Sequence, residues 1–122
     1  MNLDQQERDL LSAGLGECGG PARLTNALAF ALGFTDETHL LNEAKRIRNL
    51  IDDGVPLTPL DAARALAATE IVFASDVFGS GVEWETTTGL SDEDTIRTLR
   101  VLQRKLAGEY TVVADGIAAQ AE

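Results

Sequence analysis

The longest mostly apolar stretch of the chain is TPLDAARALAATEIVFASDVF, at residues 58–78. Thr58 suits the cap of a helix, and Pro59 suits the first helical position. At about 100° per residue, only a narrow polar arc interrupts the apolar surface of such a helix. A helix that is apolar on most sides is usually buried in the core. The pattern therefore predicts a central helix at residues 58–78, around which the rest of the chain packs.

Apolar residues at helical spacing predict four further helices, at residues 3–13, 21–32, 36–53 and 91–106. A glycine and then an apolar residue end the first three segments, at Gly14, Gly33 and Gly54, and this order is typical of helix C-termini. Ser91 and the acids after it are typical of a helix start. We therefore expect an all-α fold, a compact bundle of about five helices with a mostly buried central helix.

Residues 82–87 show a different pattern, in which apolar and polar residues alternate. A period of two predicts an extended segment. Its plausible strand partner is YTVVA at residues 110–114, although a two-stranded ribbon on its own is only marginally stable. The sequence leaves two alternatives open, a short ribbon of these segments or an ordered extended loop. For the weakly patterned residues 111–122 we expect either a flexible tail or a docked segment.

Length and composition indicate one globular domain. The chain has 122 residues, of which 44% are hydrophobic and 25% are charged, and these values are ordinary for a folded domain. A domain of this size can fold without metal ions or disulfides. The single cysteine, Cys18, has no partner for an internal disulfide, and the N-terminal sequence lacks the basic and apolar parts of a signal peptide. Both observations favour a cytoplasmic protein.

Acidic residues outnumber basic ones by 20 to 10, which gives a formal net charge of −10. Such a charge repels nucleic-acid backbones and anionic membranes. No apolar segment of the sequence is both long enough and free enough of charge to span a membrane. The same net charge favours solubility and fast association with a basic protein. The sequence therefore favours a protein partner over direct nucleic-acid or membrane binding, and it leaves homo-oligomerisation open.

The segment GLGECGG matches the spacing G-x-G-x-x-G at Gly14, Gly16 and Gly19. That motif binds dinucleotides when a strand precedes it, but here the preceding residues have a helical pattern. We therefore expect a turn between helices rather than a phosphate-binding loop. His39 is the only histidine, and neither it nor Cys18 has sequence neighbours that form a metal or catalytic cluster. The sequence predicts no catalytic residue, no metal and no cofactor.

Seven of the ten basic residues fall in two of the predicted helices. They are Lys45, Arg46, Arg48, Arg97, Arg100, Arg104 and Lys105. A basic helix face can bind an anionic ligand or a phosphate. Solvated faces whose bases pair with nearby acids are more common, and this second interpretation is favoured.

The acidic segment around Trp84 is the preferred candidate for a contact surface. A tryptophan on a glycine-flanked loop is a frequent binding hot spot, and surrounding acids attract a basic partner. In the alternative interpretation, Trp84 packs back onto the helices and anchors the loop. The acids that accompany Trp84 in the predicted partner-binding surface are Glu83, Glu85, Asp92 and Glu93.

Glu70 is the residue that does not fit the predicted central helix, since it lies with Leu66 and Phe73 on the apolar face. A buried unpaired carboxylate is costly, so Glu70 should pair with a cation, accept hydrogen bonds, take up a proton or face a cavity. Arg48, at the edge of the apolar stripe of residues 36–53, is the expected partner. A structural ion pair is the favoured interpretation, and a hidden ligand or active site at Glu70 is the alternative.

These features lead to three functional hypotheses. The first is a small acidic cytoplasmic protein-interaction module, of the antitoxin, immunity or regulatory type, that binds a basic partner. The second is a helical domain that binds a small ligand or catalyses a reaction with Glu70. The third is a structural helical protein that self-associates.

Overall fold

The computed structural model describes residues 2–20 and 22–107 of the chain. Within these ranges it contains six α-helices, one short 3₁₀-helix and no strand, which confirms the predicted all-α bundle. No helix in the described part has the length and apolarity that a membrane span requires. The elements are α1 (Gln5–Cys18), α2 (Asn26–Ala31), α3 (Glu37–Asp52), α4 (Pro59–Ala74), η1 (Gly81–Glu83), α5 (Trp84–Thr88) and α6 (Asp92–Ala107).

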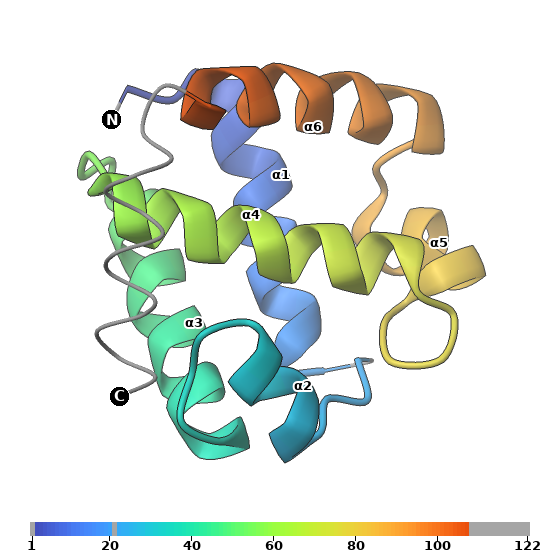
Figure 1. The fold of residues 1–122 in the computed structure, drawn as a ribbon. Coiled ribbons are helices and arrows are strands. Elements are labelled where there is room, and N and C mark those ends of the chain that lie inside the picture. The colour runs from blue at the N-terminus through green and yellow to red at the C-terminus, as the bar shows by residue number, and fades with distance from the viewer. Residues whose placement is uncertain (1, 21, 108–122) are drawn as a thin grey trace.

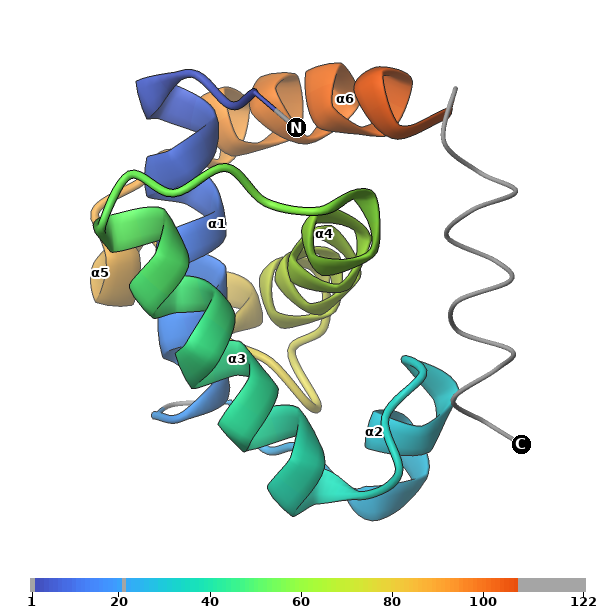
Figure 2. The ribbon, with the colours of Figure 1, turned by 90° about the vertical axis from the view of Figure 1, so that its left-hand side faces the viewer.

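Helix α4 lies at the centre of the bundle. In Figure 1 it crosses α1, with α6 along one side and α2 and α3 towards the other. Figure 2 shows α4 nearly end-on, with α1, α3 and α6 around it. Ala65, Ala68 and Val72 of α4 are buried in the core. The predicted central helix is confirmed, although it ends at Ala74 rather than at residue 78.

The narrow polar arc of α4 is buried as well. Thr69, Arg64 and Asp61 on this arc are all buried. Thr69 packs against Gly14 of α1, and Asp61 pairs with Arg46 of α3 at 2.7 Å. Because α1 and α3 both cover this side, α4 is enclosed on its polar face as well as on its apolar faces.

Two of the three predicted glycine helix ends are confirmed. Gly33 follows α2 with a φ of 92°, and Gly54 follows α3 with a φ of 76°; glycine adopts such left-handed values without steric cost. The third prediction is wrong, because α1 continues through Gly14 to Cys18. Gly14 instead allows α1 and α4 to approach, since a Cβ at this position would lie 2.1 Å from the Thr69 Oγ1 atom.

Side-chain caps fix the starts of the four long helices, α1, α3, α4 and α6. Thr58, Asp36 and Ser91 each accept a hydrogen bond from the backbone N–H three residues later, at 3.1, 2.7 and 3.1 Å. These bonds satisfy donors that have no partner within the helix. Helix α1 begins with a reciprocal capping box, in which Asp4 and Glu7 each accept the other's backbone N–H at 2.8 Å. The last three long helices are therefore capped by the side chains that the sequence predicts.

Residues 82–87 are helical, so the prediction of an extended segment there is wrong. The 3₁₀-helix η1 leads directly into α5. Alternation over six residues is a weak local signal, and burial of one large aromatic ring overrides it. That ring belongs to Trp84, which is fully buried. The predicted strand partner at residues 110–114 and the predicted tail at residues 111–122 lie outside the described residues.

Candidate functional site

Trp84 anchors the connection between α4 and α6. Its side chain is 0% exposed, and its Nε1–H donates a hydrogen bond to Thr95 Oγ1 of α6 at 2.9 Å. Its ring meets the ring of Phe73 of α4 edge-on, with 5.5 Å between centroids. The interpretation of Trp84 as an exposed contact residue is therefore wrong, and the alternative, that it packs back onto the helices, is confirmed.

Hydrogen bonds to α1 and α4 hold the same connection in place. The carboxylate of Glu17 on α1 is buried, and its Oε1 accepts hydrogen bonds from the hydroxyls of Ser80, at 2.8 Å, and Thr87. The backbone N–H of Ser80 donates to the Val72 carbonyl of α4 at 2.7 Å. These contacts fix both ends of the segment that contains η1 and α5.

Three apolar side chains on the connection between α4 and α6 face water. Val82 is 82% exposed and Val77 is 66% exposed, and Phe78 is exposed as well. Exposed apolar residues that gather in one place mark interaction surfaces more often than single ones do. With the neighbouring acids they form what we call the acidic–apolar surface. Its members are Asp76, Val77, Phe78, Val82, Glu83 and Glu85.

The acids of this surface form no ion pair with a base in the described part of the chain. No described base lies within ion-pair distance of Asp76, Glu83 or Glu85. The first turn of α6 lies at the same end of the molecule (Figure 1) and adds Asp92 and Glu93, both exposed. In that turn, Arg97 pairs with Glu93 at 3.0 Å and with Asp94 at 3.1 Å, so part of its charge is neutralised. The structure thus brings the four predicted contact acids to one end of the molecule.

The predicted pair of Glu70 and Arg48 does not form. Glu70 is half-buried in an open groove between α4 and α6, where its Oε2 accepts a hydrogen bond from Gln103 at 2.8 Å. Arg48 lies on the exposed side of α3 and donates from Nε to Ser12 Oγ of α1 at 3.3 Å. Because Glu70 faces α6 and Arg48 faces α1, the two side chains line different hollows of the molecule.

A carboxylate that the sequence pattern does not mark as a site, Glu7, is among the most deeply buried charges. It is 1% exposed, and its Oε1 accepts a hydrogen bond from Lys105 Nζ at 2.5 Å. Its Oε2 has no partner among the described residues. The four-residue pattern from Asp4 to Glu7 is the signature of a capping box, and it predicts the hydrogen bond from the Asp4 backbone N–H to Glu7 but not the burial of Glu7.

Arg64 of α4 is a buried cation. It is 2% exposed, donates to the Gly33 carbonyl at 3.2 Å, and lies 3.6 Å from the Glu43 carboxylate. Its guanidinium also lies 4.9 Å from the centroid of the Phe34 ring. Burial lowers the pKa of Arg64, while Glu43 acts in the opposite direction. These contacts connect α4 with α3 and with the α2–α3 turn, so Arg64 is a structural residue.

Cys18 is a structural thiol rather than a reactive one. Burial raises the pKa of the Cys18 thiol to about 12, and the thiolate is the nucleophilic form. We expect an aromatic disulfide reagent at pH 8 to react at least a hundred times more slowly with the folded protein than with the same protein in urea. Absorbance of the released thiolate measures both rates. Equal rates would contradict the burial of Cys18.

No group of three or more potential metal ligands occurs among the described residues. Comparisons with protein-family models, with curated proteins and with solved structures give no match for this chain. The surfaces, hollows and charges described above therefore carry the functional proposals.

Proposed function

We propose that this protein is a small acidic protein-interaction module that binds a basic partner protein through the acidic–apolar surface. The observation that carries the proposal is the exposure of Val77, Phe78 and Val82 beside unpaired acids. These residues lie on the connection between α4 and α6, which the buried side chain of Trp84 anchors. Binding that masks a basic partner, as an antitoxin or immunity protein does, is the form that we favour, with the cytoplasm as its place of action.

The apolar part of the surface supplies the contact area. Full burial of a valine or phenylalanine side chain contributes about 1.5–3 kcal/mol. A rigid contact segment also loses little conformational entropy on binding. The hydrogen bonds of Glu17 and Trp84 provide this rigidity. In this proposal Val82 takes the role of the hot spot that the sequence pattern assigns to Trp84.

The acidic part of the surface supplies selectivity for a basic partner and a faster association rate. Asp76, Glu83, Glu85 and Asp92 are exposed and have no ion-pair partner among the described bases. Unpaired charge of one sign accelerates encounter with a partner of the opposite sign, and salt screens this effect. The proposal therefore requires a partner with a basic face, and binding that weakens as salt concentration rises.

The test uses a triple variant, Val82→Ser with Glu83→Gln and Glu85→Gln, and the wild-type protein as baits in an extract of the native host. For the partner that the wild type retains, we expect the triple variant to weaken binding by about tenfold or more. Isothermal titration with the purified partner at about 0.1 M and 0.5 M salt measures the affinity and its salt dependence.

A matched control removes the same charge elsewhere on the molecule. Glu37→Gln with Asp53→Asn changes two acids at the ends of α3, away from α5 (Figure 1). We expect this control to retain the affinity of the wild type within about twofold. Equal binding by the triple variant and the wild type, or binding that is independent of salt, would overturn the proposal.

The geometry gives less support to the two other hypotheses, a ligand-binding or catalytic site at Glu70 and a self-associating protein. Glu70 accepts a hydrogen bond from Gln103 in an open groove, which gives a catalytic carboxylate little shielding from water. Self-association finds some support in Ile96 of α6, which is half exposed beside that groove. Sedimentation at several protein concentrations distinguishes self-association from binding to a different protein.

A further inference from the structure

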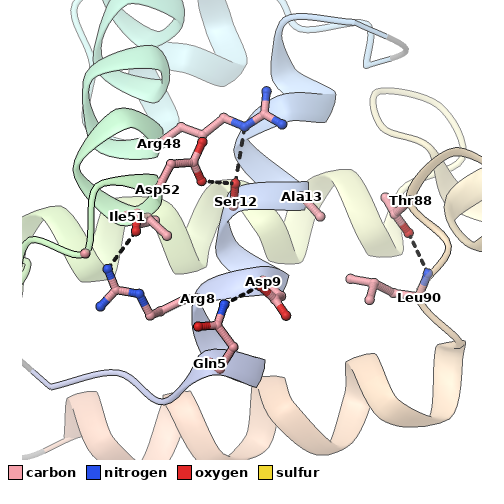
Figure 3. A pocket seen from close by; sticks show the side chains of 11 residues that line it. Gln5, Arg8, Asp9, Ser12, Ala13, Arg48, Ile51, Asp52, Thr88 and Leu90 are labelled. Atoms are coloured by element: carbon pink, nitrogen blue, oxygen red, sulfur yellow. Dashed lines mark hydrogen bonds between the residues drawn. The ribbon is translucent and has the colours of Figure 1, made fainter.

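The surface between α1 and α3 contains two adjoining hollows, of which the first also reaches Thr88 of α5 and Leu90. Their volumes are about 550 and 490 Å³, which is the range of small-molecule sites. Arg48 and Asp52 of α3 line both hollows. Figure 3 shows the first of them, with the Arg48 side chain reaching from α3 towards α1.

Arg48 is held in a defined position within this groove. Its Nε donates to Ser12 Oγ at 3.3 Å, and the same hydroxyl donates to Asp52 Oδ1 at 2.9 Å (Figure 3). The guanidinium also rests on Gly16 of α1. A Cβ at Gly16 would lie 2.9 Å from Cζ, 3.0 Å from Nη1 and 3.1 Å from Nη2. These nearly equal distances mean that the flat face of the guanidinium covers the glycine.

The two terminal nitrogens of Arg48 remain available to a ligand. No described residue accepts a hydrogen bond from Nη1 or Nη2, although Nε is engaged. A guanidinium with both terminal nitrogens free binds carboxylate and phosphate groups through two parallel hydrogen bonds. Since its plane is already fixed by Ser12 and Gly16, little conformational freedom is lost on binding.

The neighbouring residues favour an anion in the hollow of about 490 Å³. Lys45 lies one turn before Arg48 on α3, and Asn42 and Asn49 line the same hollow with amide donors. No described acid lies within ion-pair distance of Lys45 or Arg48. Asp52 is the acid of this lining, and its Oδ1 already accepts the Ser12 hydroxyl.

We propose that the α1–α3 groove binds a small organic anion with a terminal carboxylate or phosphate group, which Arg48 recognises through Nη1 and Nη2. Lys45 adds a second positive charge, and the two asparagines donate hydrogen bonds to the rest of the ligand. This site does not depend on the proposed partner surface, because α5 and the loop before it take no part in the contacts of Arg48.

The test is a titration of the ¹⁵N-labelled protein, followed by NMR, with inorganic phosphate and separately with succinate at constant ionic strength. For at least one probe we expect saturable shifts of the Ser12, Gly16 and Lys45 amides, with a dissociation constant on the order of millimolar. Saturation by phosphate alone or by succinate alone identifies the preferred anionic group. Absence of saturable shifts in the groove with both probes would overturn the proposal.

Two variants separate the site from general effects of charge and stability. Arg48→Gln should weaken binding at least tenfold, while Arg104→Gln, which removes the same charge from an exposed position on α6, should leave it unchanged. Gly16→Ala displaces the guanidinium from its seat and should weaken binding several-fold without lowering the melting temperature. Equal binding by the wild type and Arg48→Gln would also overturn the proposal.

Discussion

Replacement of Trp84 by alanine should lower the free energy of unfolding by about 3–5 kcal/mol, the usual cost of removing a buried aromatic side chain. The ring is 0% exposed and packs edge-on against Phe73. Its loss leaves a large cavity between α4, α5 and α6, and it removes the donor to Thr95. Urea denaturation followed by circular dichroism measures the change, since the variant has no tryptophan to report unfolding by fluorescence.

Two further variants separate packing from hydrogen bonding at this position. Thr95→Val removes the acceptor but keeps the volume, so it leaves a buried Nε1–H unsatisfied at a cost of about 1–3 kcal/mol. Val82→Ser lies two residues before Trp84 but is 82% exposed, and we expect a change within about 0.5 kcal/mol. A loss below about 1 kcal/mol in Trp84→Ala would show that the ring is not part of the core.

The comparison of these variants also bears on function. Trp84→Ala should weaken partner binding indirectly, because it releases the segment that presents Val82 and the acids. Val82→Ser should weaken binding while it leaves stability unchanged. A variant that affects binding but not unfolding identifies a contact residue, whereas one that affects both identifies an anchor.

The long helices of this fold were predictable from the sequence because their signals are local. Apolar residues at helical spacing mark α3, α4 and α6, and the side chains of Asp36, Thr58 and Ser91 cap these helices as expected. Capping and periodicity depend on neighbours within one or two turns. The central place of α4 follows in the same way from its low polarity.

Features that depend on distant contacts were not predictable in this way. The order of a glycine and then an apolar residue is the same at Gly14 and at Gly33, yet α1 continues through the first and α2 ends before the second. Gly14 lies against Thr69 of α4, and the local sequence does not reveal this contact. The alternation around Trp84 likewise says nothing about the pocket between α4 and α6 that accepts the ring.

The burial of the charged residues of α4 was also not predictable from the local sequence. Helical geometry places Glu70 and Arg64 on different faces of α4, but it does not say which face a neighbouring helix covers. Helices α1 and α3 cover the polar arc, so Arg64 is buried and Glu70 faces an open groove. The sequence pattern therefore singled out Arg48, but it assigned Arg48 the wrong neighbour, since the side chain donates to Ser12 and not to Glu70.

Replacement of Gly14 by alanine should lower the free energy of unfolding by about 2–3 kcal/mol, as expected for overpacking of a close helix contact. The added Cβ would lie 2.1 Å from Oγ1 and 2.7 Å from both Cβ and Cγ2 of Thr69. Because Thr69 is fully buried on α4, the strain is relieved only if the two helices move apart. Thermal and urea denaturation of the purified variant measure the loss.

Gly16→Ala is the control for this prediction, because Gly16 lies in the same helix but a Cβ there would meet only the terminal guanidinium of Arg48, which can be displaced without moving a helix. Alanine is favoured over glycine within a helix by about 0.5–1 kcal/mol, so Gly16→Ala should stabilise the protein by up to this amount. Thr69→Ala removes Oγ1 and Cγ2, and it should therefore restore part of the loss caused by Gly14→Ala. Opposite effects of the two glycine substitutions would identify contact between α1 and α4, rather than helix propensity, as the reason for glycine at position 14. Similar effects of both substitutions would contradict the close approach of these helices.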